Sequence, residues 1–202
     1  MSMLKTRMAG IAVALCLLVM FGCSAVTSKH PLSDEKTSKP DTRLLGTWKG
    51  KTNEENGWRI VAHPKSENAL MAFDLPGKLD DSADLLLTTE LGGKKYFSWG
   101  GRDSKSGKTH FFICRYEMPN ESTLRLRFLS IDAIRKAITD KRLSGRVTVV
   151  TEKKAGKLDF EQRETVRITA EMDELRSFLE ANGDACFPKG KDADTVFVRV
   201  IK

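Results

Sequence analysis

Short apolar segments recur from residue 44 onward at the spacing typical of an antiparallel β protein. Apolar and charged residues alternate in several of them. Cys114 and Tyr116 fall on one face of an expected strand, and Arg115 and Glu117 fall on the other. Such a period of two predicts strands with one buried face and one face in water. The strands are expected near residues 44–51, 57–63, 68–75, 84–91, 94–100, 109–118, 123–130, 146–151, 165–169 and 195–201.

Two segments follow helical spacing instead. Isoleucines three and four residues apart predict one helix over residues 132–141, and an apolar stripe over 172–179 predicts a second helix that ends at Asn182-Gly183. Residues 142–162 are charged and contain glycine, so we expect them to be the least ordered part of the domain. The predicted fold class is mainly β, an antiparallel β-barrel or a strongly curved sheet with two short covering helices.

The N-terminal stretch carries no charge over residues 8–21 and follows a short positive segment. These 14 residues are too few to cross a bilayer as a helix, which takes about 20, and they fit the apolar region of a signal peptide. The Gly22-Cys23 pair that follows resembles the lipobox of bacterial lipoproteins. The resemblance implies a signal peptide over residues 1–22, a diacylglycerol on the Cys23 thiol and a lipid anchor in the membrane. A transmembrane anchor, or a plain signal with a chance cysteine, is the alternative.

The residues after Cys23 predict how the mature chain is divided. Residues 24–41 are rich in Ser, Thr, Lys and Pro and have no apolar periodicity, which is typical of a flexible segment. We therefore expect a lipidated cysteine and tether over residues 23–41 and a single β-rich domain over residues 42–202. Ser24 after the cysteine resembles the sorting signal of outer-membrane lipoproteins, which implies an anchor in the outer membrane facing the periplasm.

Charge and cysteine usage narrow the possible partners. The formal net charge is +7, and two of these charges fall in the expected signal peptide. Basic residues are scattered, with no arginine-rich run and no aromatic interleaving, so nucleic acid is not an expected partner. Cys114 and Cys186 remain in the expected domain, and export would place them in a compartment that permits disulfides. The sequence leaves open a Cys114–Cys186 bridge and two separate buried thiols.

Motifs with a chemical meaning are weak. Residues 101–109 resemble a phosphate-binding P-loop, but five residues separate the glycines where the motif needs four, and the stretch leads into an expected strand. Asp80, Asp81 and Asp84 form the densest acidic cluster, with a spacing that fits a turn better than a calcium loop. No paired His or Cys motif and no Gly-x-Ser-x-Gly elbow occurs. We expect no metal, no cofactor, no catalytic residues and no enzymatic activity.

Gly46-x-Trp48 opens the first expected strand and resembles the G-x-W signature of lipocalin-like barrels. In that family the tryptophan closes the floor of the barrel, and an arginine on a late strand packs across its ring. The resemblance therefore assigns barrel-closing roles to Gly46, Trp48 and Arg199. The chain lacks the threonine-aspartate-tyrosine turn of true lipocalins and has an expected helix in mid-chain.

The wider pattern resembles a group of uncharacterised bacterial lipoproteins, which share the lipobox, the G-T-W-x-G motif, an L-x-x-F-L helix at residues 175–179 and a closing strand at residues 197–200. It implies a lipid-anchored envelope protein with a lipocalin-like domain and carries no established activity. We expect a non-enzymatic binding module for a small apolar or amphipathic ligand. The alternative is a structural or interaction protein that docks on another envelope protein or polymer.

Overall fold

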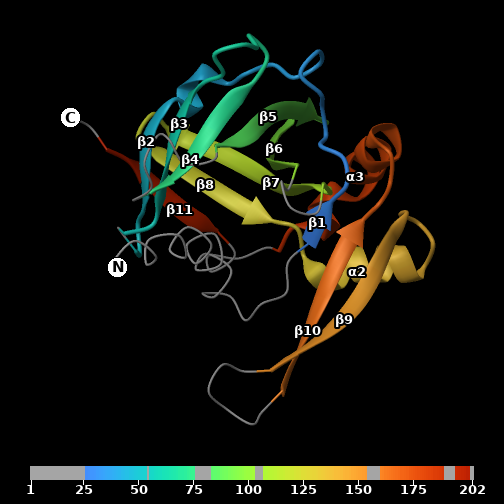
Figure 1. The fold of residues 1–202 in the computed structure, drawn as a ribbon. Coiled ribbons are helices and arrows are strands. Elements are labelled where there is room, and N and C mark those ends of the chain that lie inside the picture. Colours follow the sequence, from blue (N-terminus) through green and yellow to red (C-terminus); the bar gives the residue numbers. More distant parts are fainter. Residues whose placement is uncertain are drawn as a thin grey trace, which may run out of the picture.

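The computed structural model describes residues 26–53, 55–75, 83–102, 107–153, 160–188 and 194–200. Eight antiparallel strands close into a barrel, in the order β6-β5-β4-β3-β2-β11-β8-β7, with β7 paired back to β6 (Figure 1). The barrel strands are β2 (Gly46–Gly50), β3 (Gly57–Ala62), β4 (Leu70–Leu75), β5 (Asp84–Leu91), β6 (Lys94–Arg102), β7 (Thr109–Asn120), β8 (Thr123–Phe128) and β11 (Thr195–Arg199). The predicted fold class is confirmed, and the barrel is closed.

Three further strands extend the sheet beyond the barrel. β1 (Val26–Ser28) pairs antiparallel with β7 on one side and parallel with β10 (Phe160–Ile168) on the other. β10 forms a long hairpin with β9 (Gly145–Lys153), and this hairpin projects away from the barrel (Figure 1). Residues 142–162 were expected to be the least ordered part of the domain. Residues 145–153 and 160–162 form paired strands, whereas residues 154–159 lie outside the described residues.

Two α-helices and one short 3-10 turn complete the fold. α2 (Ile131–Thr139) lies against the β9–β10 hairpin, α3 (Met172–Cys186) contacts β5, and η1 (Thr42–Leu44) leads into β2. The prediction that the second helix ends at Asn182-Gly183 is wrong, because α3 continues for another turn. Gly183 is buried, and a Cβ there would lie 3.1 Å from the Tyr96 hydroxyl oxygen. The glycine therefore allows close packing of α3 on β6 and does not end the helix.

Residues 26–41 belong to the folded domain, so the expected flexible tether is wrong over this range. Leu32 is fully buried, and its backbone N–H donates to Ser98 Oγ at 3.0 Å. Ser38 Oγ donates to the Thr88 carbonyl oxygen at 3.1 Å and accepts from the Thr88 N–H at 3.0 Å. Serine hydroxyl groups, which made the composition of residues 26–41 typical of a disordered segment, form hydrogen bonds with backbone groups of β5. Buried polar groups need such partners, so the composition is compatible with an ordered segment.

The apolar side chains form two cores on opposite sides of the barrel wall. The barrel core is built from inward side chains that include Trp48, Trp58, Ile60, Leu86, Phe97, Cys114, Tyr116, Leu124, Leu126 and Phe197. The outer core lies among β1, the hairpin and the two helices, and includes Leu32, Tyr96, Ile113, Ile134, Val166, Leu175, Phe178 and Cys186. Consecutive residues of β6 and β7 therefore enter different cores. These two strands are buried on both faces where the helices cover them.

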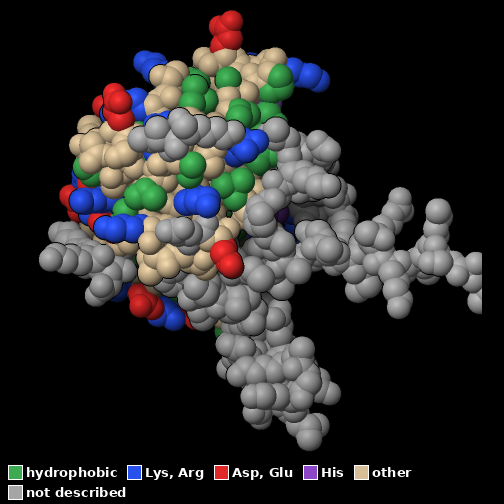
Figure 2. Space-filling model, turned by 90° about the vertical axis from the view of Figure 1, so that its left-hand side faces the viewer, with side chains coloured by type: hydrophobic (Ala, Val, Ile, Leu, Met, Phe, Trp, Pro, Cys, Tyr) green, Lys and Arg blue, Asp and Glu red, His purple; other side chains and the backbone are tan. Residues whose placement is uncertain are grey.

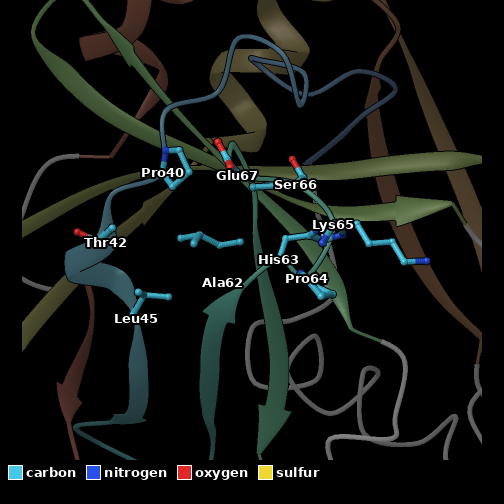
Figure 3. A pocket seen from close by; sticks show the side chains of 11 residues that line it. Pro40, Thr42, Leu45, Ala62, His63, Pro64, Lys65, Ser66 and Glu67 are labelled. Atoms are coloured by element: carbon cyan, nitrogen blue, oxygen red, sulfur yellow. Dashed lines mark hydrogen bonds between the residues drawn. The ribbon is translucent and has the colours of Figure 1, made fainter.

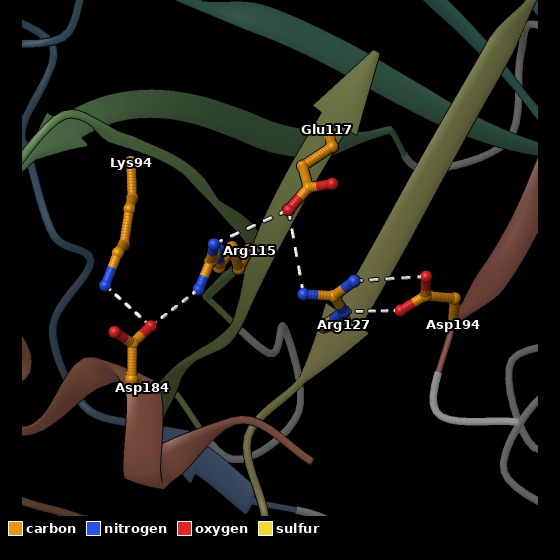
Figure 4. A network of polar contacts seen from close by, with 6 residues as sticks. All are labelled: Lys94, Arg115, Glu117, Arg127, Asp184 and Asp194. Carbon is orange, nitrogen blue, oxygen red and sulfur yellow. Dashed lines mark hydrogen bonds and ion pairs between the residues drawn. The ribbon is translucent and has the colours of Figure 1, made fainter. Parts of the chain in front are cut away.

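A network of charged side chains ties the helical layer to the outer wall of the barrel (Figure 4). Asp184 on α3 accepts from Lys94 at 2.6 Å and from Arg115 at 3.0 Å. Arg127 on β8 holds Asp194, which precedes β11. Glu117 lies between the two arginines, 3.5 Å from Arg115 and 3.6 Å from Arg127. The network links β6, β7 and β8 to α3 and to the entry of β11.

Candidate functional site

One end of the barrel is closed by Trp48 and Arg199. The Trp48 ring is fully buried, and its Nε1–H donates to the Leu44 carbonyl oxygen at 2.7 Å. The guanidinium carbon of Arg199 lies 4.3 Å from the centre of that ring, in the range of a cation–π contact. This is the arrangement that the lipocalin-like resemblance implies for these two positions.

Arg199 also fastens three separate segments to this end. Its guanidinium donates to the carbonyl oxygens of Arg43, Leu45 and Glu121. Gly46 has a φ of +129°, which strongly favours glycine, and a Cβ there would lie 2.7 Å from Arg199 Nη1. The glycine is therefore required both by its backbone conformation and by the approach of the arginine.

A second polar cluster supports the closed end from inside. Asp41 accepts hydrogen bonds from Arg43 at 2.6 Å, Lys95 at 3.0 Å and the Tyr116 hydroxyl at 3.1 Å. The hydrogen bond from Arg43, with a further contribution from Lys95, holds the pKa of Asp41 well below its usual range. Burial, together with the charge of Asp41, raises the pKa of Tyr116. Every member has a partner, so we interpret this cluster as structural.

A groove of about 460 Å³ lies beside the closed end, between residues 40–45 and the β3–β4 connection (Figure 3). Its lining mixes apolar and polar side chains: Pro40, Thr42, Leu45, Ala62, His63, Pro64, Lys65, Ser66, Glu67, Ala69 and Leu70. His63 Nδ1 accepts from the Lys65 backbone N–H at 3.2 Å, so a neutral His63 carries its proton on Nε2. All its charged or titratable side chains come from the β3–β4 connection, and residues 40–45 add only Pro40, Thr42 and Leu45.

Aromatic rings fill the barrel core from the closed end toward the opposite end. The centre of the Phe97 ring lies 5.5 Å from that of Tyr116 and 5.7 Å from that of Trp99. Trp99 in turn stacks on Phe112, with ring centres 4.9 Å apart, and meets Phe128 edge-on at 5.7 Å.

Exposure to solvent increases along this series. Phe97 is fully buried, Trp99 and Phe112 are half-buried, and Phe128 is 37 % exposed. We call the exposed end, formed by Trp99, Phe112 and Phe128, the aromatic mouth. Buried rings therefore occupy the interior of the barrel, and accessible rings lie at the aromatic mouth.

Three titratable side chains share the inward face of the strands around the aromatic mouth. Asp74 lies near the end of β4, Asp84 begins β5, and His110 lies at the start of β7. Ala72 pairs with Asp84, and Asp74 is two residues further along the same face of β4. The two carboxyl groups are therefore diagonal neighbours across a strand pair, a spacing within reach of side-chain interaction.

A glycine separates Asp84 from His110. The register of β5 and β6 places Asp84 beside Gly101, one step beyond the Leu85–Gly100 pair, and Gly101 pairs with His110 on β7. A Cβ on Gly101 would meet no atom of the described residues within 4 Å. Among the described residues, the space above Gly101, between the carboxylate and the imidazole, is consequently open.

Burial raises the pKa of Asp74 and of Asp84. For Asp74 a hydrogen bond from Trp58 Nε1, 3.0 Å from Oδ1, acts in the opposite direction. For Asp84 the charge of Asp74 raises the pKa further, while His110 lowers it. Asp84 keeps part of its surface in water, so its desolvation is only partial. Within the described ranges no lysine or arginine forms an ion pair with either carboxylate.

The two cysteines of the domain are separate free thiols, so the possible Cys114–Cys186 disulfide does not form. Cys114 points into the barrel core and its thiol donates to the Arg127 carbonyl oxygen at 3.2 Å, whereas Cys186 lies in the outer core. The barrel wall lies between the two clusters. Burial raises the pKa of both thiols, that of Cys186 to about 11.

The expected lipidation site and most of the acidic cluster are not described by the structure. Cys23, Asp80 and Asp81 lie outside the described residues. In the P-loop-like stretch, Gly101 and Arg102 end β6 and Thr109 begins β7, while residues 103–106 lie outside the described residues. The stretch therefore leads into a strand and not into a helix.

Sequence reasoning missed Asp74 as a residue of the barrel interior. A signal was present, because alternation along β4 places Leu70, Ala72 and Asp74 on one face. An acid at a position that the pattern assigns to the core is an informative exception to that pattern.

Comparisons with protein-family models, with curated proteins and with solved structures give no match. Across the part of the chain that the structure describes, His, Cys, Asp and Glu side chains form no group of three or more suited to a metal ion. No described helix combines the length and the hydrophobicity that a membrane crossing requires.

Proposed function

We propose that this protein is a lipid-anchored envelope protein that binds a small amphipathic molecule at the aromatic mouth of its barrel. The observation that carries the proposal is the increase in exposure from the buried ring of Phe97 to the solvent-accessible ring of Phe128. Aromatic side chains offer a large apolar surface at little entropic cost, and barrel mouths are common ligand sites. Polar groups at the rim would orient the bound molecule.

The lipid anchor is the first part to test. In full-length protein, Cys23→Ala should abolish incorporation of labelled palmitate and leave the signal peptide attached. Cys16→Ala, which removes a thiol within the expected signal peptide, serves as the matched control and should label normally. Normal acyl labelling of the Cys23→Ala variant would refute the anchor.

Ligand binding can be tested on the same protein by native mass spectrometry after incubation with a lipid extract. The wild-type chain should retain a small-molecule mass, and Phe128→Ala should lose it because the variant removes an accessible ring. Val149→Ala is a suitable control, since Val149 is 58 % exposed on β9 and lies outside the aromatic mouth. Equal retention by both variants would place the ligand elsewhere.

A second candidate function, docking on another envelope component, is favoured by the free edge of β9. Among the described strands β9 ends the sheet order and pairs only with β10. A strand edge with an exposed Val149 could accept an extended segment of a partner. On the face shown in Figure 2, basic side chains lie singly among apolar and acidic ones, which does not favour a purely electrostatic contact.

Pull-down from an envelope extract distinguishes this candidate. Val149→Lys would place a charge on this edge strand, so a partner bound by strand addition should be lost while the retained small-molecule mass stays unchanged. Recovery of the same partner by the variant would exclude the β9 edge.

A further inference from the structure

Two carboxylates lie on the described part of the rim of the aromatic mouth. Asp74 and Asp84 lie on the inward face of neighbouring strands, and no described lysine or arginine forms an ion pair with either. Other carboxylates of the fold, such as Asp41, Asp184 and Asp194, are held by basic side chains. The two mouth carboxylates therefore differ from those that serve the fold.

Their surroundings complement one type of ligand. Trp58 donates to Asp74 and also packs against Trp99, with ring centres 5.5 Å apart, so the carboxylate is joined directly to the aromatic mouth. The space above Gly101, which no described atom fills, lies next to Asp84. A positively charged group between two carboxylates, over ring faces, gains from ion pairing and from cation–π attraction together.

We propose that the ligand of the aromatic mouth carries an organic ammonium group, which sits between Asp74 and Asp84 while the apolar body of the ligand lies on Trp99, Phe112 and Phe128. The inference rests on the proposed function and adds the charge of the ligand to it. A neutral ligand would leave both carboxylates without an ion-pair partner among the described side chains. An anionic ligand would add a third negative charge to the same space.

Three probes of equal chain length test the charge: hexyltrimethylammonium, hexan-1-ol and hexanoate. The full-length protein, held in lipid nanodiscs, contains three tryptophans, and their indole N–H resonances can be followed by NMR with nitrogen-15 labelling. Hexyltrimethylammonium should shift the Trp58 and Trp99 resonances and leave that of Trp48, at the closed end, unchanged. Its affinity should exceed that of the neutral and anionic probes by about tenfold or more.

Substitutions make the test specific for the two carboxylates. Asp84→Asn and Asp74→Asn should each weaken binding of hexyltrimethylammonium by about five- to tenfold. Glu121→Gln removes one negative charge from the exposed turn between β7 and β8 and should leave the affinity unchanged. The indole spectra of the free variants show whether each remains folded.

The outcomes separate this inference from the proposed function. Equal shifts of Trp58 and Trp99 with all three probes would overturn the ammonium assignment and leave the aromatic mouth as a binding site. Unchanged affinity in both Asn variants would also overturn it. If no probe shifts either resonance, the proposed function fails as well.

Discussion

Replacing Arg199 by alanine should destabilise the closed end of the barrel. The substitution removes the contact with the Trp48 ring and three hydrogen bonds to backbone carbonyl oxygens. A cation–π contact at a partly exposed site is worth about 0.5–1 kcal/mol. Two of the three hydrogen bonds lie in exposed positions where water can replace the donor, so we assign about 1.5–2 kcal/mol to the set. The expected loss is about 2–3 kcal/mol in the free energy of unfolding.

Urea unfolding of the full-length protein, followed by tryptophan fluorescence, measures this loss. For a domain of this size the melting temperature should fall by about 4–12 °C. Arg125→Ala is the matched control, because Arg125 is an exposed arginine on β8, and it should change the free energy of unfolding by less than about 0.5 kcal/mol. Arg199→Lys keeps the positive charge but loses the planar guanidinium, so its free energy of unfolding should lie between those of wild type and Arg199→Ala.

The glycine next to this contact supplies an internal check. Gly46→Ala would place a Cβ against the Arg199 guanidinium and impose a φ that alanine rarely adopts. Part of the stability lost in Gly46→Ala comes from displacing the arginine. The loss in the Gly46→Ala/Arg199→Ala double variant should therefore differ from the sum of the two single losses by about 1 kcal/mol. Strict additivity, or equal stability of Arg199→Ala and Arg125→Ala, would refute the assignment of Arg199 as the residue that closes the barrel.

Three further predictions concern other parts of the domain. Leu32→Ala should cost about 2–4 kcal/mol in urea unfolding, because Leu32 is fully buried, whereas a mobile tether would show no cost. Cys114 and Cys186 should react with a thiol reagent only after denaturation, and a native mass two hydrogens short would instead indicate a disulfide. The native pKa of Asp41 lies below its unfolded value, so its contribution to the free energy of unfolding is present above about pH 4 and is lost as the pH falls. In Asp41→Asn the free energy of unfolding should therefore decrease less than in wild type between about pH 5 and pH 2. Parallel acid profiles of the variant and wild type would contradict this.

The strand pattern of the barrel could be predicted because inward and outward residues alternate. Ten expected strands correspond to β2 through β11. β1 could not be found in this way, since three residues show no periodicity and its pairing with β10 depends on residues far along the chain. The ordered structure of residues 26–41 could not be predicted either. Ser33 and Ser38 are buried polar residues, and their hydrogen-bond partners on β5 are known only from the fold.

The candidate site was less predictable than the fold. Gly46 and Trp48 form a local motif, so the closed end could be anticipated together with Arg199. The aromatic mouth depends instead on the register of separate strands, which places Phe112 next to Trp99 and Asp84 next to Gly101. Barrel register follows from strand tilt and closure as a whole, and no short motif encodes it.

The incorporation of residues 26–41 into the fold changes what a lipid at Cys23 would do. A flexible tether of that length would let the domain move roughly 25 Å from the bilayer. Three residues lead from Cys23 to Val26, a reach of at most about 11 Å, and β1 is hydrogen-bonded to strands on both sides. A lipidated protein would therefore lie against its own membrane with the β9–β10 hairpin beside the attachment point. The orientation of the domain relative to that membrane would be restricted.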